Sequence, residues 1–417
     1  MSSSPSRFHY GWVILIMATL VVFGALGLAR FGYTAVLPAM QVGLEMNNTQ
    51  AGALATANLV GYLALSVIGG AMATRYGPRA VIGVGLAVAG VGMLLTGLAN
   101  GFFEAALWRG VTGVGSGASN VPVMGLLAAW FARRRRGLAA GIAVAGSSLG
   151  LIFVGPIAPR ILTVHEENGW RVCWFVFGGV ALLLAVASLL ILRNRPWRAG
   201  MTRVGAEAEE AVPASQEKAL SWASVYLSPT VFHVGAVYAA FGFSYIIYVT
   251  FFMKCLVAEG GYTEPEAGRL FMIVGWFSLL CGLIWGTVSD VIGRKGALVI
   301  VYLIHTVAFG LFALWPVPAG FTVSAVLFGL SAWSIPAIMA ALCGDLLGAR
   351  LAPAGLGFIT LLFGIGQAIG PSVAGAMADA ADSLFPAMLL AAGVALLGAI
   401  GSALLRPASL RRSSDAA

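Results

Sequence analysis

Charged residues are scarce in this sequence. Asp, Glu, Lys and Arg make up 10% of its 417 residues, whereas about a quarter is usual for a soluble domain. Hydrophobic residues make up 59%, and this composition excludes an ordinary soluble enzyme. About 20 consecutive apolar residues cross a bilayer as a helix, and the chain divides into about twelve such runs.

Sequence motifs of catalysis and of metal binding are also missing. The sequence has no glycine-rich nucleotide loop, no HExxH, no GxSxG, and no serine with a plausible histidine–acid pair. Its four cysteines are scattered through apolar runs without metal-ligand spacing, as expected of small hydrophobic residues. We therefore predict that the protein is not an enzyme and has no cofactor or metal site.

The apolar runs predict an all-α integral membrane protein. The first run is too long for a secretory signal peptide and has no small-residue cleavage site, so we expect a retained helix. The expected spans lie near residues 10–38, 50–74, 79–98, 103–131, 137–160, 171–192, 228–253, 265–289, 296–315, 320–346, 354–378 and 384–405.

Basic residues gather in alternate short loops. The strongest block, Arg133–Arg136, precedes an apolar run that carries no charge before Arg160. Loops rich in Lys and Arg stay in the cytoplasm, and most of the 24 basic residues lie on one side if both termini are cytoplasmic. We expect a multi-pass protein of the cell inner membrane, oriented in the lipid bilayer by these basic loops. Its net charge of +8 lies in short loops between apolar runs and does not indicate binding of nucleic acid.

This topology can be tested with single cysteines. In a background without the four native cysteines, a cysteine at 133–136 or in the segment 193–222 should resist membrane-impermeant thiol reagents in intact cells, because both segments are predicted to be cytoplasmic. A cysteine near Arg160 is the control that should be labelled. Labelling of both basic segments from outside would contradict the orientation.

The middle of the chain differs from the rest. Residues 194–222 are polar, with prolines and mixed charge, and we predict a cytoplasmic linker between an N-terminal bundle, 1–193, and a C-terminal bundle, 223–417. The segment GTVSDVIGRK at 286–295 repeats the pattern of GAMATRYGPR at 70–79. Gly155-Pro156 likewise recurs as Gly370-Pro371. These pairs indicate an internal duplication of six helices.

Several of these motifs resemble known ones. The segment WFARRRRGLAAGIAVAGSSLG at 130–150 resembles the signature between helices 4 and 5 of monocarboxylate transporters. The paired loops, and Arg109 with Gly113 and Gly115, resemble motifs found widely in the major facilitator superfamily. The resemblance, to the bacterial monocarboxylate and oxalate–formate branch, implies twelve transmembrane helices in two six-helix bundles. It also implies a monomeric secondary transporter in which helices 1, 4, 7 and 10 face a central cavity.

The loop resemblance predicts gating residues near the cytoplasm. The second loop has the complete pattern, in which the acid Asp290 precedes Arg294. The first loop keeps Arg75 and Arg79, but Thr74 stands where the acid is usual. A carboxylate at a helix end can pair with a basic residue in one conformation and release it in another. We therefore predict that Arg75, Arg79, Asp290 and Arg294 act in gating.

Arg30 is the strongest candidate for substrate binding. It lies deep within the first apolar run, whereas the acids Glu104, Asp290, Asp345 and Asp379 all stand toward the ends of runs. An arginine at bilayer depth is costly without a partner, and its guanidinium can bind a carboxylate with two parallel bonds. The other predicted substrate-binding residues are polar or aromatic side chains of the cavity helices, namely Tyr33, Asn58, Arg109, Asn120, Tyr245, Tyr248 and Gln367.

We therefore expect transport of a small organic anion, a monocarboxylate above all, by alternating access. Proton symport and anion exchange both stay open, because no acid stands at mid-membrane depth. The interiors of helices 8 and 11 also lack a Lys or Arg, whereas the oxalate-type relatives have basic residues that matter on these helices. One alternative is efflux of a drug or another amphipathic compound, which Gly155-Pro156 favours weakly. Another is a transporter-like sensor or assembly partner, which should tolerate loss of Arg30.

Overall fold

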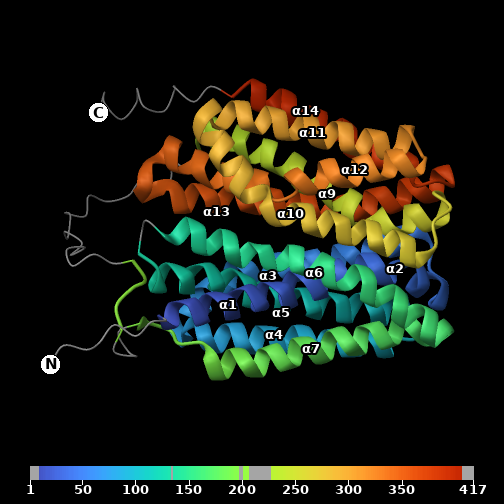
Figure 1. Cartoon of the computed structure of the whole chain (residues 1–417), viewed down its shortest axis with the longest axis horizontal. Coiled ribbons are helices and arrows are strands. Elements are labelled where there is room, and N and C mark those ends of the chain that lie inside the picture. Colours follow the sequence, from blue (N-terminus) through green and yellow to red (C-terminus); the bar gives the residue numbers. More distant parts are fainter. Residues whose placement is uncertain (1–8, 133–134, 197–200, 206–226, 406–417) are drawn as a thin grey trace.

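The computed structural model describes residues 9–132, 135–196, 201–205 and 227–405, and nearly all of them are helical. Figure 1 shows the helices running side by side along the long axis, with the start of the first helix and the end of the last helix at the same end of the molecule, hereafter the end that carries the termini. One isolated parallel bridge, between Phe131 and Val204, departs from this helical pattern. The predicted substrate-binding residues are therefore all positioned by helices.

The N-terminal half begins with one long helical span in three parts. Its middle is a π-helix, η1, in which each backbone hydrogen bond joins residues five positions apart, one more than in the α-helices on either side. A short 3-10 turn, η3, joins the last two helices of this half. The elements are α1 (Tyr10–Val22), η1 (Phe23–Phe31), α2 (Gly32–Gly43), α3 (Asn48–Tyr76), α4 (Pro78–Leu98), α5 (Phe102–Trp130), α6 (Arg136–His165), η3 (Glu166–Asn168) and α7 (Gly169–Ile191).

The C-terminal half repeats the arrangement with one long helical stretch, α13, that contains the end of the tenth predicted span and the whole of the eleventh. The loop expected near 347–353 keeps a helical backbone, so the predicted break between spans 10 and 11 does not occur there. A turn at Ala332 and Trp333 interrupts the tenth span instead. The elements are α9 (Pro229–Ala258), α10 (Glu264–Ile292), α11 (Arg294–Leu314), α12 (Pro318–Ser331), α13 (Ser334–Ala381) and α14 (Phe385–Ala403).

By length and composition, 8 helical stretches of the described chain could cross a membrane, or up to 10 if each of two bent pairs counts as one span. One of these stretches, Arg136–Ile191, contains both α6 and α7. When those two are separated and α5 is added, the helices correspond one for one to the predicted spans. The prediction of spans from apolar runs is therefore confirmed, apart from the details at η1 and at α13.

Two glycines at equivalent positions make the turns of the repeated loops. Gly77 lies between α3 and α4 with φ 86°, and Gly293 lies between α10 and α11 with φ 84°. Residues with a side chain rarely adopt this left-handed conformation, which glycine adopts readily. The two loop motifs therefore share backbone geometry as well as sequence, as an internal duplication predicts.

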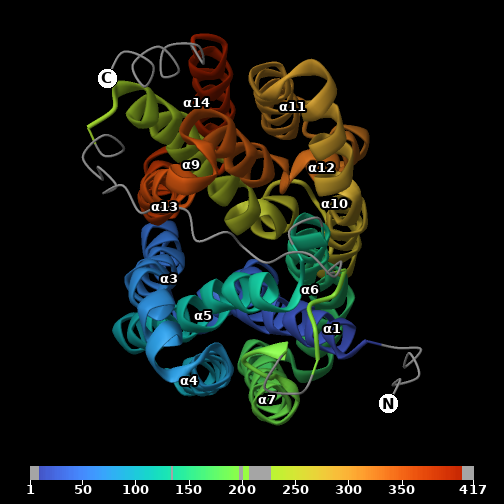
Figure 2. The ribbon, with the colours of Figure 1, turned by 90° about the vertical axis from the view of Figure 1, so that its left-hand side faces the viewer.

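The two halves lie on opposite sides of the molecule. Figure 2 shows α1 to α7 on one side and α9 to α14 on the other, with α3 next to α13 and α6 next to α10. Within the N-terminal half, α3 and α5 approach so closely that a Cβ at Gly61 or Gly113 would overlap backbone atoms of the other helix. Small residues permit this close packing in lipid.

Part of the predicted linker is packed against the N-terminal half. Val204 donates its N–H to the carbonyl of Trp130 at 2.9 Å, and its own carbonyl accepts the N–H of Ala132 at 3.0 Å. The Val204 side chain is buried. Residues 194–222 are therefore not a uniform solvated segment, because one apolar residue within them completes a hydrophobic contact at the end of α5. The parts at 197–200 and 206–222 lie outside the described residues.

Candidate functional site

Arg30 stands at the end of the π-helix in the middle of the first span. Gly27 of the same segment packs against α6, where a Cβ would come within 2.7 Å of the Gly150 Cα. The absence of side chains at both glycines lets the two backbones meet. π-Helical segments are rare, and they are found frequently at functional sites.

The guanidinium of Arg30 has an unsatisfied edge. Its Nε and Nη2 are shielded from solvent and have no hydrogen-bond partner among the described residues. These two nitrogens form the edge that binds a carboxylate through parallel hydrogen bonds. The flat face of the guanidinium covers the ring of Tyr62, with Cζ 4.5 Å from the ring centroid. Two buried donors of a charged group are therefore available.

The N-terminal half contributes a second unsatisfied group close to Arg30. The side-chain amide of Asn120, on α5, donates to the Tyr62 hydroxyl at 2.8 Å. The amide oxygen of Asn120 is buried without a partner among the described residues. Buried polar atoms are nearly always hydrogen-bonded in folded proteins. The row of Arg30, Tyr62 and Asn120 is therefore a polar cluster with unused hydrogen-bonding capacity.

The C-terminal half covers this cluster with aromatic side chains. Tyr245, on α9, is close enough to Arg30 for the two side chains to interact electrostatically. Its hydroxyl accepts a hydrogen bond from Gln367 of α13, and its ring stacks on Phe363 with a centroid distance of 6.1 Å. Trp333 meets the Tyr245 ring edge-on at 6.1 Å. The predicted residues Arg30, Asn120, Tyr245 and Gln367 are thus brought together between the halves.

Arg109 lies behind the π-helix and is only 1% exposed. Its Nη1 donates to the carbonyl of Ala29 at 2.7 Å. Its guanidinium lies between two rings, 4.8 Å from the centroid of Tyr33 and 4.9 Å from that of Trp174. Such cation–π contacts stabilise a buried charge that has no acidic partner. Arg109 therefore fixes the backbone beside Arg30 and adds positive charge next to it.

Tyr33 and Asn58 support the same region by bonding to the backbone. The Tyr33 hydroxyl donates to the carbonyl of Ala51 at 2.7 Å, which joins α2 to α3. The side chain of Asn58 donates to the carbonyl of Arg109 at 3.1 Å, which joins α3 to α5. Both side chains are buried. These two hydrogen bonds hold together the helices that carry Arg30 and Arg109, so Tyr33 and Asn58 are suited to position the two arginines.

The structure places Tyr248 away from this cluster, in contrast to the sequence prediction. Its hydroxyl forms a hydrogen bond with Ser324 of α12 at 2.8 Å. Its ring packs against Phe309 and Phe328 at 4.6 and 4.9 Å. The sequence could not separate Tyr248 from Tyr245 because α9 is buried on nearly every face, so polar and aromatic residues point in several inward directions.

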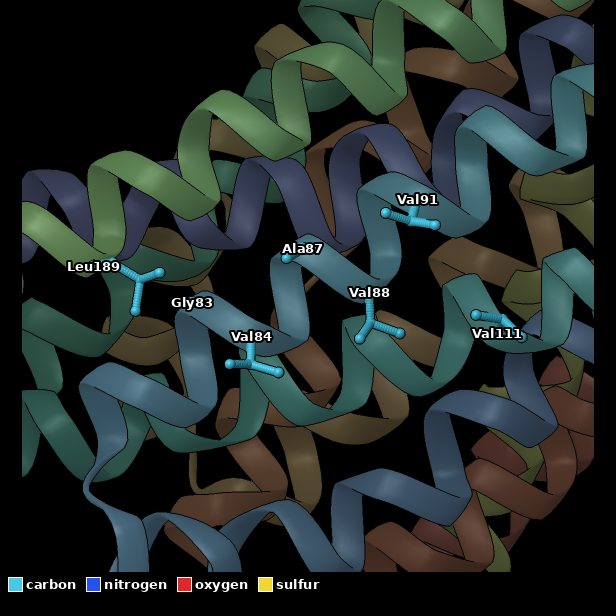
Figure 3. A pocket seen from close by; sticks show the side chains of 7 residues that line it. All are labelled: Gly83, Val84, Ala87, Val88, Val91, Val111 and Leu189. Carbon is cyan, nitrogen blue, oxygen red and sulfur yellow. The ribbon is translucent and has the colours of Figure 1, made fainter.

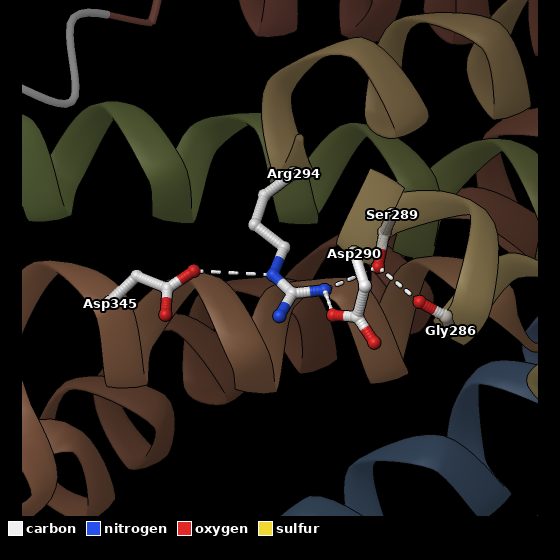
Figure 4. A network of polar contacts seen from close by, with 5 residues as sticks. All are labelled: Gly286, Ser289, Asp290, Arg294 and Asp345. Atoms are coloured by element: carbon white, nitrogen blue, oxygen red, sulfur yellow. Dashed lines mark hydrogen bonds and ion pairs between the residues drawn. The ribbon is translucent and has the colours of Figure 1, made fainter. Parts of the chain in front are cut away.

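The second of the two repeated loops, at 286–295, forms a polar network within the C-terminal half. Arg294 pairs with Asp290 at 2.5 Å and with Asp345 of α13 at 3.2 Å, as Figure 4 shows. The same guanidinium donates to the hydroxyl of Ser289 at 2.5 Å. Because both carboxylates are more than half exposed, each pair alone contributes little stability. The network joins α10, α11 and α13 at the end of the molecule that carries the termini.

The basic side chains of the first repeated loop, at 70–79, contact neutral groups. Arg79 donates from Nε to the carbonyl of Leu189 at 2.6 Å and from its backbone to the Asn194 side chain at 2.9 Å. Thr74 donates to the carbonyl of Ala71 in its own helix. Arg75 covers the ring of its neighbour Tyr76, with Cζ 5.4 Å from the centroid. The first loop is therefore tied to α7 without the acid that the second loop contains.

This asymmetry predicts unequal effects of mutation. Asp290→Asn should slow transport more than Thr74→Ala, because only Asp290 contributes an ion pair to the Arg294 network. Equilibrium substrate affinity should change by less than about threefold in either variant, since both loops lie at the end of the helices, far from Arg30. Transport rate and binding should be compared in both variants. Normal transport by Asp290→Asn would contradict a gating role, and the second loop would then serve only to set the orientation of the helices in the membrane.

The halves touch from the middle of the helices to the end opposite the termini, hereafter the closed end. Thr56 of α3 donates to the carbonyl of Ala368 at 2.6 Å, and Ser278 of α10 bonds to Ser148 of α6 at 2.7 Å. Toward the other end, several glycines have no neighbouring helix close by. A Cβ added to any of them would lie more than 4 Å from every atom beyond the adjacent backbone of its own helix; these glycines are Gly70, Gly137, Gly141, Gly282 and Gly286. The described helices are thus tightly joined at one end.

A shallow groove on the N-terminal half does not belong to this site. Figure 3 shows that it runs along α4 and is completed by Val111 of α5 and Leu189 of α7. All its lining residues are apolar or glycine: Gly83, Val84, Ala87, Val88, Val91, Val111 and Leu189. Such a lining offers no side chain that could orient a charged solute.

Sequence reasoning did not assign Tyr62, Trp333 or Ser148 to the site. Tyr62 stands four residues after Asn58, so their shared helix face was a usable signal. Trp333 donates to the hydroxyl of Ser148 at 3.1 Å, across the two halves. Nothing in the sequence places these two residues together, because the contact depends on how α6 meets the turn before α13.

The helices therefore form a bundle of paired halves with a polar cluster between them, an arrangement found in the major facilitator fold of membrane transporters. A bacterial homologue of the human lysosomal transporter Spinster, solved in an inward-facing and unoccupied conformation, has the same fold. Its TM-score is 0.77 at 16% identity, over 99% of both chains. A D-xylose–proton symporter gives a TM-score of 0.75 at 15% identity, over 95% of this chain and 98% of the symporter.

The chain belongs to the family described as the uncharacterised MFS-type transporter YbfB, whose model matches residues 22–402. It is also similar to the hexuronate transporter of Bacillus subtilis, at 25% identity over 89% of each chain. Monocarboxylate transporter 3 of Rattus norvegicus is 27% identical, over 82% of this chain and 69% of the relative. These findings confirm the predicted superfamily and the predicted fold class. They also confirm that the chain resembles the monocarboxylate branch.

Proposed function

We propose that this protein is a secondary transporter of small organic anions, and that Arg30 binds the carboxylate of the substrate. The observation that carries the proposal is the Nε–Nη2 edge of Arg30, which is buried without a partner among the described residues. Leaving charged donors unsatisfied in a buried site is costly. A carboxylate would satisfy both donors at once, after Tyr62 or Tyr245 turns aside to admit it.

The names of the relatives agree with this chemistry. A hexuronate and a monocarboxylate each carry a carboxylate, and transporters so named resemble this chain over most of its length. The amide oxygen of Asn120 would accept a hydrogen bond from the substrate, and Tyr245 and Gln367 would close the cluster from the other half. Arg109, Tyr33 and Asn58 would position Arg30 without being the first contacts of the anion.

The structure suggests how access would alternate. We infer that the bundles 1–193 and 223–417 move as units around Arg30, joined by the segment 194–222. If both termini are cytoplasmic in the inner membrane, the closed end faces outward, and this conformation is the inward-facing one. Proton symport and anion exchange are both compatible with the site, and Asp290 with Arg294 would act at its cytoplasmic rim.

The proposal can be tested by a ligand screen on purified protein. A ligand that binds the folded state raises the unfolding temperature by mass action. We expect small carboxylates to do so, whereas their neutral amides, such as lactamide beside lactate, should not. Equal stabilisation by acid and amide would contradict the role of the carboxylate. Stabilisation by lipophilic cations alone would favour drug efflux.

A further inference from the structure

The closed end contains an acidic residue that bonds to the opposite half of the protein. Asp379, near the end of α13, accepts the backbone N–H of Asn48 at 2.8 Å and that of Thr49 at 2.7 Å. It also accepts the hydroxyl of Thr49 at 2.5 Å. These three hydrogen bonds join residues more than 300 positions apart in the sequence. They lie at the point where α3 begins.

The first turn of α3 explains why an acid binds there. The first N–H groups of a helix have no partner within the helix. The side chain of Asn47 accepts the N–H of Gln50, which leaves the N–H groups of Asn48 and Thr49 for another acceptor. A carboxylate at this position also interacts favourably with the positive end of the helix dipole. Asp379 therefore caps α3 from the other half.

A lysine adds a second connection at the same place. Lys254, on α9, donates to the side-chain oxygen of Gln41 at 2.5 Å and to the side-chain oxygen of Asn48. Asn48 thus contacts Asp379 through its backbone and Lys254 through its side chain. Because α9 and α13 belong to the C-terminal half and Gln41 and Asn48 to the N-terminal half, all these bonds cross between the halves.

Beneath these polar contacts, the backbones of α3 and α13 touch directly. A Cβ on Gly52 would overlap the carbonyl of Pro371, and a Cβ on Gly375 would overlap the carbonyl of Asn48. Close-packed backbones of this kind permit little gradual sliding. When α3 and α13 separate, the bonds to Asp379 must therefore break together.

We propose that Asp379 is a latch that sets the balance between the two conformations of the transporter by capping α3 only when this end is closed. Opening exposes the N–H groups of Asn48 and Thr49 to water and removes the charged acceptor. Asp379 therefore stabilises the closed-end conformation selectively, whichever solute is carried.

Distances between the halves test this latch without any substrate. Spin labels on Phe103→Cys and Leu314→Cys, exposed residues of α5 and α11 at the closed end, report its opening by pulsed electron paramagnetic resonance. The four native cysteines are replaced in this background. We expect one dominant short distance in the parent, and a ratio of open to closed protein at least about tenfold higher in Asp379→Ala. Tenfold corresponds to about 1.4 kcal/mol.

Glu259 offers a matched control at the same end. It also caps a helix, since it accepts the hydroxyl of Ser383 and the N–H of Leu384, but these partners lie in its own half. Glu259→Gln should leave the distance distribution unchanged, and Lys254→Met should shift it in the same direction as Asp379→Ala. A parental distribution in Asp379→Ala, or an equal shift in Glu259→Gln, would overturn the latch.

Discussion

Purified Arg30→Ala protein should fold and yet bind organic anions at least a hundredfold more weakly than the parent. Each hydrogen bond between a charged group and its partner is worth about 1.5–3 kcal/mol, and the carboxylate would lose two of them. The folded structure should survive, because Nε and Nη2 of Arg30 make no hydrogen bond to other described residues. Calorimetric or thermal-shift titration with the best anion of the screen measures both properties.

Arg30→Lys separates charge from geometry. Lysine keeps the positive charge but cannot make two parallel bonds to a carboxylate, so we expect a weakened remnant of binding. Arg171→Ala is a suitable control, because Arg171 donates to the carbonyls of Gly97 and Ala99 at the closed end. It should bind anions like the parent. If Arg30→Ala binds them as tightly as the parent, Arg30 is a structural arginine.

Arg109→Ala should cost more stability than Arg30→Ala, and weaken anion binding less. The Arg109 side chain fills the space between Tyr33 and Trp174 and holds the carbonyl of Ala29. Truncating a large buried side chain costs about 2–5 kcal/mol. The π-helix would then lose its support, so binding should be intermediate between that of the parent and of Arg30→Ala.

The unfolding transition in detergent distinguishes these two roles. Arg109→Lys should recover part of the stability, because an ammonium can still donate to the Ala29 carbonyl although it stacks poorly between two rings. A parental unfolding temperature in Arg109→Ala would contradict the supporting role. Binding as weak as in Arg30→Ala, without loss of stability, would instead make Arg109 a direct contact of the anion.

The sequence predicted most of the fold because lipid imposes simple rules. Apolar length predicted the spans, and the repeated loops predicted an internal duplication, which agrees with the equivalent turns at Gly77 and Gly293. Arg30 could be singled out because a charge at bilayer depth needs a reason. These inferences use properties of one segment at a time, and they required no knowledge of how the helices meet.

The remaining features depend on contacts between distant segments. The π-helix at Phe23–Phe31 has no residue pattern of its own, although Gly24 and Gly27 permit close packing there. Asp379 was noted only as an acid near a helix end, since its partners Asn48 and Thr49 offer backbone groups that every sequence contains. Tyr248 was assigned to the site because periodicity does not show which of several buried faces meets the cluster around Arg30.

The positive charge beside the π-helix also has an electrical consequence. Arg30 and Arg109 lie close together without an ion pair to any described acid. When access to an empty cavity changes from one side to the other, this charge changes its position within the membrane potential. One elementary charge crossing the whole membrane exchanges about 2.3 kcal/mol per 100 mV. A bound monocarboxylate neutralises one positive charge, so the voltage should act more strongly on the empty carrier than on a carrier that has bound the anion without a proton.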